Sequence, residues 1–195
     1  MPLEGDKVLL REVREADIPL LREMRNDLVT QAWNKTLPPD YPDVVFRKLL
    51  DAREFSYDPD SGRFIIEVKE SSEAVGAINY SGLERRYSAD YGIMIKKDHF
   101  GKGIAFDAQE CLLRFLFCEL GVTVVRLWTH SGNPRMIGLA KKSGFQIAFR
   151  QREAVLKEGQ LFDNVNMDLL AEEYFERHPE LPNPQEQRKT GNKRE

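Results

Sequence analysis

Residues 99–117 read HFGKGIAFDAQECLLRFLF, in which two glycines and a lysine run directly into an apolar helical pattern. Gly101 and Gly103 allow the backbone to adopt positive φ and to approach a ligand closely. The predicted helix begins without a Ser, Thr or Asp cap, so its first amide N–H groups lack partners. Together with Lys102 and the positive end of the helix, these amides favour a phosphate or pyrophosphate. A tight turn whose amides face water explains the loop equally well.

The glycine loop does not match the common nucleotide-binding loops. A Walker-type loop needs Gly-Lys-Ser/Thr, whereas Gly103 is followed by Ile104 and Ala105. A dinucleotide fingerprint needs a third glycine, and Phe106 occupies that position. A nucleotide-binding protein stays open as an alternative.

The elements around the loop indicate the fold class. Strands are predicted at 63–69, 74–82 and 87–96, and the polar turns between them indicate an antiparallel meander. A strand at 122–130 and a helix at 133–145 follow the loop helix, which is predicted over 103–120. The other predicted elements are a strand at 7–13, helices at 14–26, 27–33, 44–55 and 171–177, and a hairpin over 145–170 that turns at Glu158-Gly159. This order predicts a mixed α/β sheet rather than a doubly wound parallel one.

Length and composition predict one domain over residues 1–177 of the 195-residue chain, followed by a polar, disordered tail at 178–195. The net charge of −3 argues against nucleic acid as a partner. There is no apolar run of about 18 residues and no signal-peptide pattern, so we expect a cytoplasmic protein without a membrane partner. Cys111 and Cys118 are expected to be small core residues, and the three histidines lack metal-ligand spacing.

Two motifs resemble the GNAT superfamily of acetyl-CoA-dependent N-acetyltransferases. The hexapeptide FGKGIA at 100–105 is similar to the family's Arg/Gln-x-x-Gly-x-Gly/Ala loop, with Phe100 in place of Arg or Gln. Downstream, Asn133 and the Lys-x-Gly-Phe at 142–145 resemble the branch of the ribosomal-protein N-terminal acetyltransferases RimJ and RimL. The likeness covers about residues 7 to 170.

The resemblance implies a mixed, mostly antiparallel sheet of about seven strands with helices on both faces and strands four and five splayed apart. It places the pyrophosphate of acetyl-CoA on the loop amides and the pantetheine arm along 92–95, where edge N–H groups would stabilise an oxyanion. Asn133 would bind the arm, although a simple helix cap explains it equally well. Gly138 either lets the cofactor pass closely or packs closely within the protein. The implied cofactor-binding residues are Ile93, Met94, Ile95, Phe100, Gly101, Lys102, Gly103, Ile104, Ala105 and Asn133.

Acetyl transfer also needs a base for the amine and a proton for the leaving thiolate. Many relatives carry a tyrosine acid five residues before the Phe of Gly-Phe, and here that position is Ala140. Asp90 aligns with an acidic residue that often precedes the glycine of the fourth strand, so the resemblance implies it as the base. A solvated strand residue or a salt-bridge partner is the alternative role of Asp90.

Four further residues are candidates for the reaction. His130 and Tyr91 join Asp90 as catalytic candidates, and Trp33 and Tyr80 are assigned to the substrate. A capping or surface role is the alternative for His130, and packing is the alternative for the aromatic residues.

The sequence therefore predicts direct acetyl transfer from acetyl-CoA to a primary amine, without a metal or a covalent enzyme intermediate. A protein N-terminus, a polyamine and another small amine all remain open as acceptors, and the protein is expected to be a monomer or a homodimer. The missing tyrosine at Ala140 leaves a catalytically silent acyl-CoA-binding module as the alternative.

Overall fold

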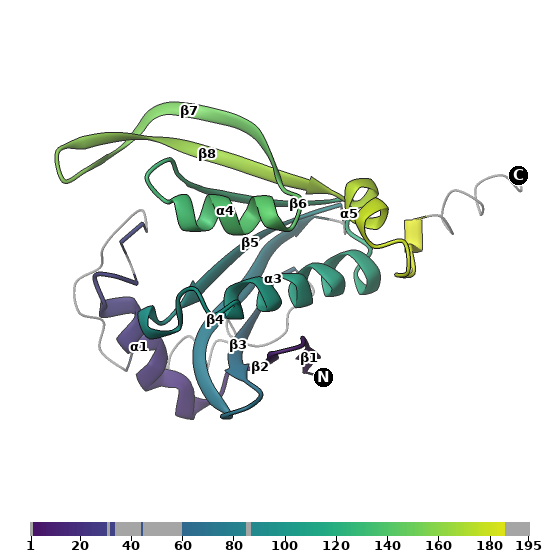
Figure 1. The fold of residues 1–195 in the computed structure, drawn as a ribbon, viewed down its shortest axis with the longest axis horizontal. Coiled ribbons are helices and arrows are strands. Elements are labelled where there is room, and N and C mark those ends of the chain that lie inside the picture. Colours follow the sequence, from purple (N-terminus) through teal and green to yellow (C-terminus); the bar gives the residue numbers. More distant parts are fainter. Residues whose placement is uncertain (1, 31, 34–43, 45–59, 85–86, 186–195) are drawn as a thin grey trace, which may run out of the picture.

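The computed structural model describes residues 2–30, 32–33, 44, 60–84 and 87–185. Within these residues eight strands form one sheet in the order β1-β2-β3-β4-β5-β6-β8-β7 (Figure 1). The bounds are β1 Leu3–Glu4, β2 Val8–Glu12, β3 Gly62–Val68, β4 Glu73–Glu84, β5 Ser88–Ile95, β6 Val124–His130, β7 Gln146–Lys157 and β8 Gln160–Leu170. The predicted mixed, mostly antiparallel sheet is confirmed.

One pair of neighbouring strands differs from the others. All neighbours are antiparallel except β5 and β6, which are parallel and pair from Ser88↔Val124 to Asp90↔Arg126. Beyond these pairs the two strands diverge, so residues 91–95 of β5 and 127–130 of β6 are not paired with each other. We call these two diverging arms the fork, and they correspond to the predicted splay.

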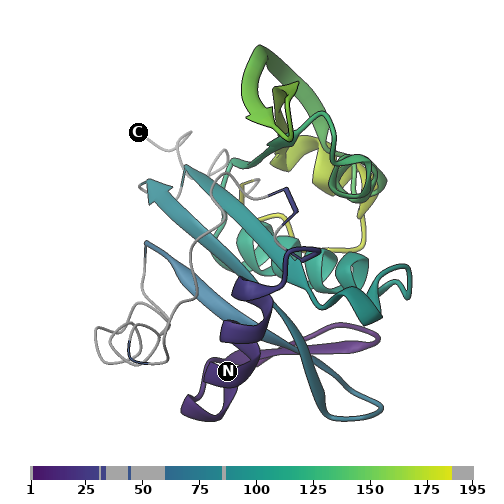
Figure 2. The ribbon, with the colours of Figure 1, turned by 90° about the vertical axis from the view of Figure 1, so that its left-hand side faces the viewer.

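Helices cover both faces of the sheet (Figures 1 and 2). Their bounds are α1 Ile18–Asn26, α3 Ile104–Arg114, α4 Pro134–Lys142 and α5 Ala171–Arg177. The apolar side chains of α1 pack on Ile65 and Ala77 on one face. The larger core lies on the other face, where α3 and α5 bury residues such as Leu112 and Tyr174. Among the described residues, no helix is long and apolar enough to cross a membrane.

The predicted helix over 27–33 is wrong. Helix α1 ends at Asn26 because Asp27 is extended, with φ −76° and ψ 115°. The Asp27 carboxylate accepts the amide N–H of Val29 at 2.8 Å, which stabilises a turn in place of a further helical turn. The helix predicted over 44–55 lies outside the described residues except for Val44.

The C-terminal part of the chain differs from prediction in its boundaries. The helix predicted over 103–120 is α-helical as far as Arg114 and then forms a π-helical turn over Phe115–Glu119. The packed chain extends past residue 177, since Leu181 contacts the core and the Gln185 side chain donates to the carbonyl of Val122 at 2.9 Å. The predicted tail boundary at 178 is therefore too early.

Candidate active site

The fork opens where two helices begin. Strand β5 leads through a 3₁₀ turn at Lys97–His99 into the glycine loop and α3, and β6 leads into Asn133 and α4. Both helices therefore start at the open end of the fork (Figure 1). Ligands of α/β proteins bind beyond the carboxyl ends of parallel strands where neighbouring connections diverge. The topology thus places a cleft-forming site at this end of the sheet.

The glycine loop, residues 100–105, has the backbone conformation that its glycines predict. Gly101 and Gly103 have φ of 76° and 80°, a region that side chains with a Cβ disfavour. Gly103 is the N-cap residue of α3, and no side chain of the described residues caps this helix. The first N–H groups of α3 therefore point into the loop, as a phosphate cradle requires.

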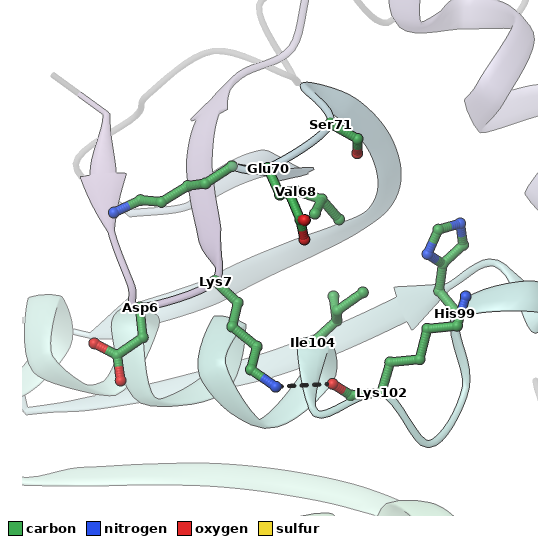
Figure 3. Close-up of a pocket in the computed structure, with 9 residues that line it drawn as sticks. Asp6, Lys7, Val68, Glu70, Ser71, His99, Lys102 and Ile104 are labelled. Atoms are coloured by element: carbon green, nitrogen blue, oxygen red, sulfur yellow. Dashed lines mark hydrogen bonds between the residues drawn. The ribbon is translucent and has the colours of Figure 1, made fainter.

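A lysine from the connection between β1 and β2 binds the backbone of the glycine loop. The Nζ of Lys7 donates to the carbonyl of Lys102 at 3.2 Å, at the edge of a pocket of about 650 Å³ (Figure 3). Asp107, in the first turn of α3, fixes the backbone there by accepting the N–H groups of Asp6, Lys7 and Val8 at 3.0, 2.7 and 2.9 Å. Lys7 could not be assigned to the loop from the sequence, because 95 residues separate it from Lys102.

Helix α4 brings a second positive charge to the loop. The guanidinium of Arg135, in the first turn of α4, lies 4.8 Å from the ring centroid of Phe100. The Nζ of Lys142 lies 3.8 Å from the ring centroid of Phe106 in α3. Cation–π contacts of this kind favour one position of a mobile cation. Phe100 thus holds a cation from another element beside the glycine loop.

Asn133 caps α4. Its Oδ1 accepts the N–H of Met136 at 3.2 Å, and its Nδ2 donates to the hydroxyl of Thr129 at 3.1 Å. The capping alternative is confirmed by these contacts. Contact with a pantetheine arm stays a prediction. A side-chain amide nitrogen carries two N–H donors, so Nδ2 can donate a second hydrogen bond besides the one to Thr129.

The β5 arm of the fork has one edge that pairs with β4 and one edge that does not pair with β6. On one side Ile93, Met94 and Ile95 pair with Ile78, Ala77 and Gly76 of β4. The other side faces the fork, where neither these residues nor those of the β6 arm are paired across it. Unpaired N–H and C=O groups of a strand edge can bind an extended ligand as an added strand.

The two polar candidates, Asp90 and His130, lie on the two strands that form the fork and on one face of the sheet. Asp90 is the last paired residue at the closed end of the fork, and it is exposed on the face that α1 covers. Its Oδ2 would lie 3.4 Å from a Cβ at Gly82. His130 ends β6 and is 1 % exposed, with its ring centroid 5.7 Å from that of Trp128. Strand alternation places His130 and Asp90 on the same face.

The two tyrosines lie in the core instead. Tyr80 is 1 % exposed, and its ring centroid is 6.0 Å from that of Phe115. Tyr91 is also buried, and its hydroxyl donates to Oε1 of Gln109. Burial raises the pKa of Tyr91 well above 10. Both side chains point to the larger core and away from the face of Asp90, which is the packing role left open for them by the sequence. The substrate role of Tyr80 and the proton-donor role of Tyr91 stay predictions that this burial does not favour.

Trp33 lies next to the start of α4. A Cβ at Gly132 would be 2.3 Å from the indole, so the ring fits only because residue 132 is glycine. The indole makes a T-shaped contact with Phe162 at 5.3 Å, and the Nζ of Lys157 lies 4.9 Å from its centroid. The aromatic group thus lies at the open end of the fork, where its contact with an acceptor stays a prediction.

Three further residues of α3 and α4 bear on the chemistry of the site: Ala140, Gly138 and Cys111. Ala140 is fully buried, so the position of the usual tyrosine presents no group of its own. A Cβ at Gly138 would meet no atom of the described residues within 4 Å, so close packing among them is not the reason for glycine there. Burial raises the pKa of the Cys111 thiol to about 11, so it stays protonated at neutral pH and is a poor nucleophile.

Comparison with known proteins decides the family. The model of the acetyltransferase (GNAT) domain matches residues 7–146. The chain belongs to the GNAT acetyltransferase family. This GNAT protein is 23% identical over 174 residues to the spermidine N(1)-acetyltransferase of Escherichia coli K12, covering 88% of this chain and 90% of the relative. It is 25% identical over 167 residues to an L-methionine sulfoximine/L-methionine sulfone acetyltransferase of Pseudomonas aeruginosa, covering 82% and 92%.

Solved structures agree with the fold of this GNAT protein. The spermidine N-acetyltransferase of Vibrio cholerae, in complex with CoA and spermine, superposes with a TM-score of 0.78 at 20% identity, covering 88% of this chain and 99% of the other. The protein is therefore an N-acetyltransferase with acetyl-CoA as its acetyl donor, as the resemblance implied. The finer resemblance to RimJ and RimL is not carried by these relatives and stays a prediction.

Proposed function

We propose that the protein acetylates a small primary amine of the polyamine kind by direct transfer at the fork. The observation that carries the proposal is the divergence of β5 from β6 beyond Asp90, next to a glycine loop whose helix, α3, has no side-chain cap among the described residues. The acceptor class is supported by relatives that are named for spermidine. A protein N-terminus, as the RimJ and RimL resemblance implies, is the competing acceptor. A cytoplasmic monomer or homodimer without membrane or nucleic-acid partners is part of the proposal.

The nucleotide end of acetyl-CoA would lie on the glycine loop. The amides of 101–105 and the ammonium group of Lys7, which donates to the carbonyl of Lys102, would face its pyrophosphate, and Arg135 of α4 lies beside Phe100. Hydrogen bonds to charged groups contribute about 1.5–3 kcal/mol each. Two or three such contacts are enough to hold a solvent-exposed diphosphate.

The thioester end would lie in the fork. The pantetheine arm would lie along the fork-facing edge of 92–95, with Asn133 approaching it from the β6 side. An N–H group of this edge is then directed at the carbonyl oxygen, where negative charge develops when the amine attacks. Fixed donors of this kind lower the barrier to acyl transfer by about 2.7–4 kcal/mol each.

The acceptor would approach from the face that carries Asp90. The Asp90 side chain is exposed at the closed end of the fork. There its carboxylate can take a proton from the ammonium group of the acceptor, directly or through one water. His130, on the other arm, is the second candidate base. Trp33 presents an aromatic face at the open end, and aromatic faces attract ammonium groups.

The test is the release of coenzyme A by the purified protein with spermidine, spermine, methionine sulfoximine and a peptide with a free N-terminus. We expect release with the polyamines to exceed release with the peptide by at least tenfold in kcat/KM. Faster release with the peptide would refute the polyamine proposal and favour the RimJ and RimL branch. Absence of release with every amine would refute transfer to these acceptor classes.

A further inference from the structure

A buried polar network lies beneath the fork. Gln109 of α3 is fully buried, and its Oε1 accepts the hydroxyl of Tyr91. Its Nε2 donates to the hydroxyl of Ser143 and to the carbonyl of Leu139, the latter at 3.3 Å. Ser143 is 2 % exposed and Tyr91 is 7 % exposed. One carboxamide therefore joins β5, α3 and the C-terminal end of α4 in a water-free position.

The network is located where the fork divides. Asp90 is the last residue of β5 that pairs with β6, and Tyr91 is the next residue along the strand. The Tyr91 ring packs on Phe145, with 5.7 Å between centroids, while its hydroxyl donates to Gln109, so both contacts hold Tyr91 in this position. Gln109 thus contacts Tyr91, the first residue of the β5 arm.

Each element that Gln109 joins carries one part of the proposed site. Helix α3 begins at the glycine loop, the β5 arm forms one side of the fork, and α4 begins at Asn133. Apolar side chains alone pack at many similar angles, whereas a buried polar network is satisfied in few arrangements. The angle between the arms is therefore coupled to the hydrogen bonds of one side chain.

We infer that Gln109 is a positioning residue, which through Tyr91 and Ser143 fixes the opening of the fork and so aligns the thioester with the β5 edge. This role rests on the proposed placement of the pantetheine arm. It also gives Tyr91 a function that its buried hydroxyl can perform, in place of proton transfer.

We expect substitutions in this network to affect the thioester end of the cofactor and to leave the binding of its nucleotide end unchanged. Tyr91→Phe and Ser143→Ala each remove one bond to Gln109 and keep most of the local shape. Because misplacement by about 1 Å can cost about 100-fold in rate, we expect kcat to fall about 10- to 100-fold in each variant. The affinity for 3′-phospho-ADP, which contacts the glycine loop alone, stays within twofold of wild type. The double variant loses less than the product of the two single losses, since both act through Gln109.

A binding measurement tests the same point without turnover. The ratio of the Kd for 3′-phospho-ADP to the Kd for coenzyme A reports the contribution of the arm, and we expect this ratio to fall about tenfold in both variants. Cys111→Ala is the matched control, because Cys111 is a buried residue of α3 outside the network. It lowers the melting temperature, whereas the ratio and kcat stay at wild-type values.

The outcomes separate this inference from the proposed function. Wild-type kcat and ratio in both variants would overturn the role of Gln109 while leaving the fork as the site. A parallel loss of affinity for 3′-phospho-ADP would also overturn it, since that result means general unfolding of the site. A wild-type protein that binds coenzyme A no more tightly than 3′-phospho-ADP would refute the proposed placement of the arm itself.

Discussion

Replacement of Gly103 by alanine tests the glycine loop most directly. The backbone at Gly103 has φ 80°, and a residue with a Cβ costs about 1–2 kcal/mol in this region. The alanine also reduces the entropy of the unfolded chain, which offsets about 0.4–1 kcal/mol. The net loss in the free energy of unfolding is about 1 kcal/mol, which lowers the melting temperature of a chain of this size by about 2–4 °C.

The larger effect concerns acetyl-CoA. The new Cβ would lie 3.2 Å from the Nζ of Lys7, so the flexible lysine tip must shift by a few tenths of an ångström, in addition to the strain at residue 103. Where these changes together remove one charge-assisted contact to the pyrophosphate, binding loses about 1.5–3 kcal/mol. Since each 1.4 kcal/mol corresponds to about tenfold in affinity, we expect the KM for acetyl-CoA to rise about 10- to 100-fold.

The assay is the initial rate of coenzyme A release at varied acetyl-CoA and a fixed, saturating amine, together with thermal unfolding. Gly159→Ala is the matched control, since it is the same substitution at a similar φ of 77°, in the turn between β7 and β8, where a Cβ would meet no atom of the described residues within 4 Å. We expect this control to lose a similar amount of stability, about 1 kcal/mol, and to leave the KM for acetyl-CoA unchanged. An unchanged KM in Gly103→Ala would refute the phosphate cradle.

Three further changes probe other contacts. Trp33→Ala should raise the KM for the amine about tenfold and leave the KM for acetyl-CoA unchanged; equal effects on both would contradict an acceptor contact. Arg135→Ala should raise the KM for acetyl-CoA about three- to tenfold, more at low than at high salt, and an effect independent of salt would argue against a phosphate contact. Burial raises the pKa of Asp17, but the bonds from Arg11 at 2.8 Å outweigh it and hold this pKa below 3.8. The ionised Asp17 therefore stabilises the fold above about pH 4, and urea unfolding should show this contribution disappearing towards pH 2 in wild type but not in Asp17→Asn.

The elements of the sheet could be predicted from sequence because their signals are local. Alternating apolar residues defined the meander, and the turn at Glu158-Gly159 has the positive φ values, 49° and 77°, that a tight hairpin needs. The helix expected over 27–33 failed for a local reason as well, since one hydrogen bond from Asp27 competes with a weak helical pattern. Local signals therefore decide the elements, together with their exceptions.

The contacts of the site could not be predicted in the same way, because they join distant residues. Lys7 reaches the loop only because Asp107 binds three amides about 100 positions away. Gln109 resembles any polar residue of an amphipathic helix until the fold buries it. Tyr80 and Tyr91 lie in the core because a strand has two faces, and the sequence did not decide which face lies toward the acceptor.

Because Ala140 stands where many relatives carry a tyrosine acid, no side chain at this position protonates the leaving thiolate. The free-energy costs of the two proton transfers show how much this matters. A thiol with a pKa of about 8.5 leaves as a thiolate at pH 7 at a cost of about 2 kcal/mol. Deprotonation of an amine with a pKa of about 10.4 costs about 4.6 kcal/mol at the same pH. The base therefore contributes more than the acid. If Asp90 accepts the proton from the bound ammonium group, kcat/KM stays level between pH 7 and 9 in wild type. In Asp90→Asn only the neutral amine reacts, so kcat/KM should rise about tenfold per pH unit over that range. The same slope in both proteins would remove Asp90 as the base and leave His130 as the remaining candidate.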